Sequence, residues 1–205
     1  MTNKTTSQGP GRPRAFSEAD VLDRATGVFL TRGFEATAYE DIATATGLSK
    51  PSLYNAFGDK SALFGKVLEG YTAHARRQVL ETFSSGVDIA DATRAMLLAA
   101  ANVYAPPKGP STGCLLVGTA LPACNQHDKV RKTLADFLAA IEGDLTSIIE
   151  ERHATEARRR GRSPRSLALQ VSSVLVALAV RARTGLPRRR LRAAAAELAA
   201  TISAV

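Results

Sequence analysis

The stretch from Thr37 to Lys60, TAYEDIATATGLSKPSLYNAFGDK, constrains the fold of this chain more than any other. It predicts two short helices joined by a tight turn, with a third helix beginning directly after them. Gly47 ends the first helix, because glycine reaches positive φ without a Cβ penalty. Ser49 is a good N-cap for the second helix, and Pro51 lies in its first turn, where no backbone donor is lost. Two helices at this spacing form the helix-turn-helix plan.

The same stretch predicts which side of the second helix faces outward. Thr37 and Glu40 fit a capping box, Thr-x-x-Glu, so the first helix is expected to begin at Thr37. In the second helix Leu53 and Phe57 lie four residues apart and face inward. The outward residues are then Lys50, Pro51, Ser52, Tyr54 and Asn55. In a helix-turn-helix this second helix enters the DNA major groove by its N-terminal end.

These residues resemble the N-terminal DNA-binding domain of TetR-family transcriptional regulators. The resemblance covers roughly residues 16–64 and is specific, because many spaced positions match at once. The matching positions are Ala25, Phe29, Gly33, Phe34, Thr37, Ile42, Ala43, Gly47, Leu48, Ser49, Leu53, Tyr54, Phe57, Lys60 and Leu63. Beyond residue 70 the resemblance is one of layout only, with several helices and a similar total length.

The resemblance implies an all-α protein with two functional parts. Residues 16–60 would form a three-helix DNA-binding domain, preceded by a disordered basic arm at 1–15. Residues 61–205 would form a helical regulatory domain that binds a ligand and dimerises through the last two helices, packed as a four-helix bundle. The implied partners are a double-stranded, pseudopalindromic DNA operator and a small-molecule inducer. The expected function is a homodimeric, ligand-responsive transcriptional regulator, most simply a repressor.

Several residues are candidates for contacting the phosphate backbone of DNA. Thr37 and Ser49 stand at helix starts and can offer hydroxyl and N–H groups to phosphate oxygens. The family uses a Tyr and a Lys at the positions of Tyr54 and Lys60, so the resemblance implies these two as phosphate partners. A set of merely solvated polar side chains is the alternative.

Other residues of the second helix are candidates for reading base edges. Asn55 can pair with adenine through two hydrogen bonds, and Lys50 can donate to guanine. Ser52 offers a hydroxyl, and Pro51 can touch a thymine methyl group.

The N-terminal arm and the charge distribution bear on the same function. The arm ends in GRPR, which resembles the core of an AT-hook, so Arg12 and Arg14 are expected in a narrow minor groove; a solubilising tail is the alternative.

The net charge of +8 supports DNA binding only weakly. Residues 1–60 hold seven basic and seven acidic residues, whereas residues 151–205 hold twelve and three. That excess leaves a non-specific nucleic-acid binder as an open alternative.

Ala and Leu dominate the hydrophobic residues and β-branched runs are few, which favours helices throughout the chain. The expected elements are a helix from Ser17 to Gly33, helices over 60–83 and 88–104, a loop at 105–110, a short apolar segment at 114–121 ending at Pro122, a helix over 128–156, a basic loop at 158–162, and helices opening at Ser163 and Pro187.

The regulatory domain holds candidates for ligand binding. We expect Tyr71, His74, Tyr104, Cys114 and Phe137 to line an apolar pocket for the inducer. Two cysteines make no disulfide framework. Cys114 and Cys124 are either apolar core residues or sensors of oxidants or electrophiles, which would need an accessible thiol.

Other chemistry has no support in the sequence. His74, His127 and His153 are too widely spaced for a metal site, so we expect no metal and no cofactor. No catalytic arrangement of Ser, His and Asp or glycine-rich phosphate loop stands out, and we expect no enzyme. A small helical enzyme or ligand carrier is the rival class. No apolar stretch of 18 residues is free of charge and no signal peptide is evident, so we expect a cytoplasmic protein without membrane contact.

Overall fold

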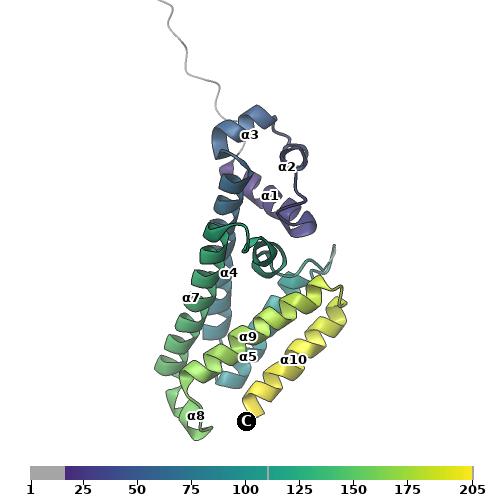
Figure 1. Cartoon of the computed structure of the whole chain (residues 1–205). Coiled ribbons are helices and arrows are strands. Elements are labelled where there is room, and N and C mark those ends of the chain that lie inside the picture. Colours follow the sequence, from purple (N-terminus) through teal and green to yellow (C-terminus); the bar gives the residue numbers. More distant parts are fainter. Residues whose placement is uncertain (1–16, 110, 205) are drawn as a thin grey trace, which may run out of the picture.

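The computed structural model describes residues 17–109 and 111–204, and these residues are helical with no strand among them (Figure 1). The all-α fold class is confirmed. The elements are α1 (Glu18–Arg32), α2 (Tyr39–Thr46), α3 (Lys50–Phe57), α4 (Lys60–Ser84), α5 (Ile89–Tyr104), the wide π-helical segment η1 (Leu116–Ala120), α6 (Leu121–Ala123), α7 (Asp128–Arg152), α8 (Ala154–Arg159), α9 (Pro164–Arg183) and α10 (Arg188–Ala204).

The elements form two groups, with α1 to α3 at one end of the molecule (Figure 1). α4 leads away from that end and packs along α7. α9 packs on α5, α7 and α10, and α10 also packs on α5. η1 contacts α1, α7 and α9, so it lies where the two groups of helices meet.

The predicted turn between α2 and α3 is confirmed in its backbone geometry. Gly47 adopts the left-handed conformation, with φ 74° and ψ 12°, and its N–H donates to Ala43 O. Ser49 caps α3, and its hydroxyl oxygen accepts a hydrogen bond from Ser52 N–H at 3.3 Å. Pro51 lies in the first turn of α3, as expected. These local signals form the turn that joins α2 to α3 in the helix-turn-helix.

The predicted capping box at Thr37 is wrong. α2 begins at Tyr39 with Ala38 as its N-cap, and Asp41 rather than Glu40 accepts a hydrogen bond from the Ala38 N–H, at 2.9 Å. Thr37 is instead buried, with 1% of its surface exposed, and its hydroxyl donates to Gly33 O. The threonine therefore stabilises the loop between α1 and α2 instead of capping a helix.

Two further boundaries differ from the predicted elements. The helix expected over 128–156 ends at Arg152, because the buried ring of His153 packs edge-on to Phe83 and α8 begins anew after it. The basic loop expected at 158–162 therefore starts inside α8. Pro122 does not end the apolar segment, since it lies in the first turn of α6, where proline is tolerated.

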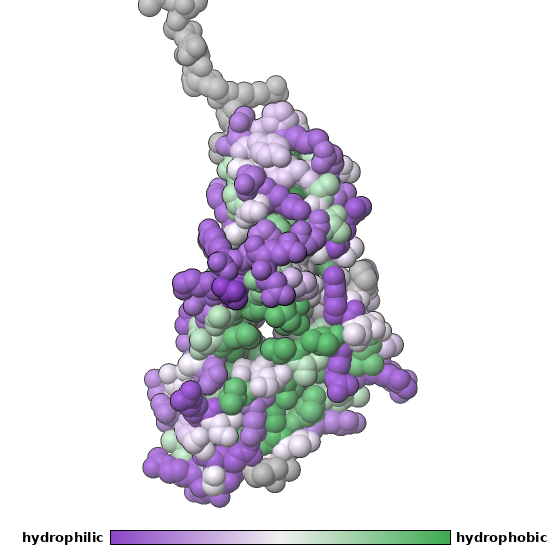
Figure 2. All heavy atoms as spheres, viewed as in Figure 1, coloured by the Kyte–Doolittle hydropathy of each residue, from purple (hydrophilic) through white to green (hydrophobic). Residues whose placement is uncertain are grey.

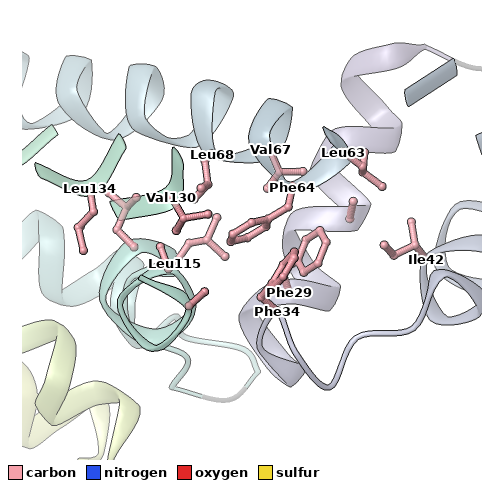
Figure 3. Close-up of a cluster of buried hydrophobic side chains, with 14 of the residues drawn as sticks. Phe29, Phe34, Ile42, Leu63, Phe64, Val67, Leu68, Leu115, Val130 and Leu134 are labelled. Carbon is pink, nitrogen blue, oxygen red and sulfur yellow. The ribbon is translucent and has the colours of Figure 1, made fainter. Parts of the chain in front are cut away.

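One hydrophobic core extends from the helix-turn-helix into the second group of helices (Figure 3). Phe64 of α4 packs against Phe29 and Phe34, with ring centroids 4.8 and 4.7 Å apart. Leu115, just before η1, and Val130 of α7 join the same cluster. The first turns of α4 thus close the core of the N-terminal domain, and displacement of α4 or η1 would be felt by α1.

α9 is long and apolar enough, by length and composition, to span a membrane, unlike every other helix that the structure describes. No such helix was expected from the sequence. Its apolar character has a simpler cause, since it packs between α5, α7 and α10. The buried residues of α9 are Leu167, Ala168, Val171, Leu175, Leu178, Ala179 and Ala182.

Candidate nucleic-acid interface and its adjoining cavity

Buried contacts hold α2 and α3 in a fixed relation to α1. Ile42 of α2 and Leu53 of α3 are fully buried, and Phe57 is 4% exposed. Arg24 of α1 donates from Nη1 to Ala45 O of α2 at 3.1 Å. α3 therefore presents its outward face from a rigid support, as a recognition helix requires.

The outward face of α3 carries most of the predicted DNA-contacting residues. Ser52 is partly exposed and the other members are exposed: Ser49, Lys50, Pro51, Tyr54 and Asn55. The ring of Tyr54 stacks on Tyr39, with centroids 4.3 Å apart, and the Tyr39 hydroxyl donates to Gly58 O at 2.6 Å. Burial, with smaller contributions from Tyr54 and Asp59, raises the pKa of Tyr39, which keeps this supporting hydroxyl protonated.

Lys50 is held by an ion pair across the two helices. Its Nζ donates to Glu40 Oε1 on α2, and both side chains are exposed. The hydrogen bond from Lys50 is the main cause that lowers the pKa of the Glu40 carboxyl. Lys50 is the one cationic residue within α3.

Two predicted phosphate partners have other partners in this structure. Lys60 Nζ donates to Phe34 O at 3.0 Å, to Thr37 O at 3.1 Å and to Glu35 O at 3.4 Å. These bonds use all three ammonium protons. Thr37, buried as described above, also donates its N–H to Phe34 O. Thr37 is therefore corrected from a DNA-facing group to an internal support of the loop before α2. Lys60 supports the same loop in this structure, and its contact with DNA phosphate stays a prediction.

Arg12 and Arg14 lie outside the residues that the structure describes, so their contact with the minor groove stays a prediction.

A cavity of about 400 Å³ lies among the C-terminal helices. Its wall is mainly apolar and comes from α4, α5, α7, α9 and the segment around η1. Four of the five predicted ligand-binding residues line it: Tyr71, Tyr104, Cys114 and Phe137. His74 does not line it; it is exposed and lies beside Arg77. Polar groups on the wall that the sequence analysis missed are Gln78, Glu81, Thr82, Asn102 and Ser172.

A cysteine and two tyrosines form the polar part of one cavity wall. The Tyr71 hydroxyl accepts a hydrogen bond from Leu115 N–H at 3.3 Å and donates to Cys114 Sγ at 3.5 Å. Burial is the main cause that raises the pKa of Tyr71 and of Tyr104 well above the usual value, so both stay neutral. Cys124 is buried away from this wall, and its thiol donates to Ala120 O at 3.3 Å.

Two side chains bind the C-terminal end of α1 to the cavity-bearing helices. The buried Thr119 hydroxyl of η1 donates to Phe29 O at 3.0 Å. Arg183, the last residue of α9, donates from Nη1 to Leu30 O. Neither residue was singled out in the sequence, because their partners are 90 and 153 residues away.

The geometry agrees with known proteins. A family model described as bacterial regulatory proteins, tetR family, matches residues 21–67. The HTH-type transcriptional repressor BdcR of Escherichia coli is 28% identical over 197 residues, which cover 96% of this chain and 94% of that protein. A structure of the TetR family transcriptional regulator CifR, a cysteine mutant complexed with 26-bp double-strand operator DNA, superposes with a TM-score of 0.81 at 27% identity, over 93% of this chain and 98% of CifR. The chain belongs to the TetR family.

The resemblance stated from the sequence is thereby confirmed, and it extends well beyond residue 70. This TetR-family protein is a helix-turn-helix transcriptional regulator that binds DNA. Reduced NemR of E. coli shares the fold, with a TM-score of 0.71 at 19% identity. The supporting residues that sequence analysis missed are Tyr39 beneath Tyr54, and Thr119 and Arg183 at the end of α1. Only Tyr39 had a sequence signal, because it opens α2 beside the recognition helix.

Proposed function

We propose that this TetR-family regulator is a homodimeric, cytoplasmic repressor that leaves its pseudopalindromic operator when a small, mainly apolar molecule fills the cavity. Residues 16–60, with the start of α4, act as the DNA-binding domain, and residues 61–205 act as the regulatory domain. The repressor name of BdcR and the operator complex of CifR support the DNA half of this proposal. The cavity supports the ligand half.

In this proposal α3 contacts DNA through its exposed face. Ser49 and Tyr54 contact phosphates, the latter from its stacked position on Tyr39. Asn55 and Lys50 read base edges, with Ser52 and Pro51 beside them. Arg12 and Arg14 would add minor-groove contacts from the arm.

The main support for ligand control is the short path from the cavity to α1. Leu116 and Val117 of η1 line the cavity, and Thr119 of the same segment donates to Phe29 O. A ligand that moves η1 therefore acts directly on the helix that supports α2 and α3. Because α9 also holds α1 through Arg183, the position of the DNA-binding domain depends on the cavity walls from two sides.

An exposed apolar stripe supports a dimer through the last two helices. Leu169 and Val180 of α9 are 52% and 45% exposed, and Ser173 and Ala177 lie between them on the same face. Hydrophobic residues gather on this side of the molecule, over α9 and α10, whereas the helix-turn-helix end is mainly hydrophilic (Figure 2). A twofold mate would bury the stripe and set the spacing of the two α3 helices.

The test begins with selection of random double-stranded DNA on the purified protein at physiological salt, followed by sequencing. We expect a pseudopalindrome whose half-sites lie about one helical turn apart. A compound library is then screened for release of that DNA. A true inducer should also bind more weakly to the DNA-bound protein by the same factor, since coupling is reciprocal. Lack of any enriched motif, with binding that vanishes as salt rises, would refute the proposal.

The coupling path has its own variant pair. Thr119→Val removes the hydroxyl that binds Phe29 O while keeping the side-chain shape, and should reduce the effect of an inducer on DNA affinity. Thr146→Val removes a hydroxyl that bonds only within α7, to Glu142 O at 2.7 Å, and should leave the effect unchanged.

A second candidate function is a thiol-based sensor at Cys114. The specific observation is that Cys114 lines the cavity and receives a hydrogen bond from the Tyr71 hydroxyl. Mass spectrometry after treatment with N-ethylmaleimide tests it. Modification of Cys114 that releases operator DNA, and no release in Cys114→Ser, would support sensing by the thiol. Modification without release would leave Cys114 as an ordinary wall residue.

The basic C-terminal third gives less support to a non-specific binder. Many of its arginines donate to groups of the protein itself. Those with such partners are Arg152, Arg158, Arg160, Arg162, Arg183, Arg188 and Arg192.

A further inference from the structure

The ion pair between α2 and α3 carries an inference about base recognition. Glu40 stands in the first turn of α2, and Lys50 is the first residue of α3. Their side chains are 60% and 47% exposed, and they meet at the N-terminal end of α3, the end that enters the groove in the proposed function. We propose that this pair reads one C·G base pair in each half-site, with Lys50 donating to guanine and Glu40 accepting from the N4 amino group of cytosine. The inference rests on DNA binding by α3.

The chemistry of the two groups matches this base pair better than either group alone. A lysine ammonium offers only donors, and an ionised carboxylate offers only acceptors. In the major groove guanine presents two adjacent acceptors, N7 and O6, and its cytosine presents the N4 donor beside them. An A·T pair separates its two acceptors with a donor and adds a methyl group. The Glu40–Lys50 pair therefore complements the G·C edge in both position and sign.

The negative charge of Glu40 indicates a role in discriminating between DNA sequences. A carboxylate beside a recognition helix is repelled by phosphates and would be unfavourable in a surface built only for affinity. The nearby Asp41 is engaged within the fold, by Arg32 at 3.1 Å and by the Ala38 N–H. The side chain of Glu40 has Lys50 as its partner. The pair thus approaches non-specific DNA without net charge, and it contributes most binding free energy where both groups meet a base edge.

The experiment uses the full chain and its selected operator. Binding of wild type, Glu40→Met and Lys50→Met is measured on three probes: the unmodified operator, one with N4-methylcytosine and one with 7-deazaguanine at the candidate pair. The first modification replaces the groove-facing N4–H, and the second removes N7. N4-methylcytosine should weaken wild-type binding by about 5- to 20-fold and leave Glu40→Met nearly unchanged, the range expected of a base-edge contact. 7-Deazaguanine should weaken wild type and Glu40→Met, but not Lys50→Met.

A matched control separates base reading from loss of a surface ion pair. Glu18→Met breaks an ion pair of similar exposure, to Lys66 at 2.9 Å, which joins α1 to α4. Lys66 also lies 5.4 Å from the centroid of the Phe57 ring, on the inward side of α3, so the pair is remote from the outward face of that helix. Glu18→Met should respond to both modified probes as wild type does. Glu40→Met should also bind non-operator DNA more tightly, because it removes a negative charge beside α3; the modified probes, which this charge effect does not favour or disfavour, separate base reading from a structural role. Thermal denaturation checks each fold, and Glu40→Ala replaces Glu40→Met if that variant unfolds.

Three outcomes would overturn the inference. One is a selected half-site with no G·C pair at the position that Lys50 controls. Another is N4-methylcytosine weakening wild type and Glu40→Met equally. The third is N4-methylcytosine having no effect on wild type; if Glu40→Met then also loses its response to 7-deazaguanine, Glu40 only positions Lys50. Absence of any selected motif would instead refute sequence-specific binding itself.

Discussion

Replacing Lys60 by methionine distinguishes a role inside the fold from a role on DNA. Methionine keeps the length and apolar stem of lysine and removes the ammonium. In the structure this group donates to Phe34 O at 3.0 Å and Thr37 O at 3.1 Å, and it lies 4.6 Å from the centroid of the Phe34 ring. The substitution therefore leaves the loop before α2 without its central donor.

The size of the effect follows from these contacts. A hydrogen bond to a charged group contributes about 1.5–3 kcal/mol net, and a cation–π contact at a partly exposed site about 0.5–1 kcal/mol. Since one ammonium serves several carbonyls and water can replace part of the loss, we expect Lys60→Met to lower the free energy of unfolding by about 2–3 kcal/mol. At about 2–4 °C per kcal/mol for a chain of this size, the melting temperature falls by about 4–12 °C.

The assay combines thermal denaturation with the salt dependence of operator binding, measured below the melting temperature. A lysine that contacts phosphate contributes about one unit to the slope of log K against log salt. We expect the slope of Lys60→Met to equal that of wild type. Lys66→Met is the control: its exposed ion pair with Glu18 contributes at most about 1 kcal/mol, and its contact with the Phe57 ring, 5.4 Å from the centroid, about 0.5–1 kcal/mol, but it donates to no backbone carbonyl of the loop before α2. A variant that melts like wild type but loses one unit of slope would refute this reasoning and restore Lys60 as a phosphate contact.

Three further predictions follow from the same geometry. Asn55→Ala should relax specificity at one base position by about 1–3 kcal/mol, seen by repeating the DNA selection. Tyr54→Phe should weaken binding to all DNA sequences alike while the ring stays stacked on Tyr39, seen in binding titrations on operator and random DNA. The pKa values of Tyr71 and Tyr104 are raised in the folded protein, so the unfolded chain releases these protons first and the free energy of unfolding falls above about pH 10. Melting temperatures measured between pH 8 and 11 should decline less steeply for the variant with both Tyr71→Phe and Tyr104→Phe.

Much of the recognition unit could be predicted because its causes are local. The left-handed Gly47, the cap at Ser49 and the tolerated Pro51 depend on backbone chemistry within a few residues. The inward pair of Leu53 and Phe57 follows from helix periodicity alone. These features form in any fold that contains the segment, so they could be predicted without knowing which helices pack against it.

Helix phase explains the correct part of the cavity prediction on α4 but not the incorrect one. Tyr71, Ala75 and Val79 line the cavity at spacings of four residues, which keeps them on one side of α4. His74 is exposed, although Gln78 and Glu81, four and seven residues further on the same face of α4, line the cavity; its position along the helix, and not its phase, keeps it off the wall. Which part of α4 faces a cavity was settled by the packing of α5 and α7 against it, and the periodicity of α4 alone could not supply this.

The amino-acid sequence by itself determined the helices, the helix-turn-helix and the family, because these depend on short-range periodicity, caps and turns. The tertiary structure decided the roles of individual polar groups. Lys60 finds its carbonyl partners 23 to 26 residues away, and Thr119 finds Phe29 O at a separation of 90. A buried or half-buried donor must satisfy its hydrogen bonds wherever folding brings an acceptor, so its role depends on distant chain segments that no local pattern records.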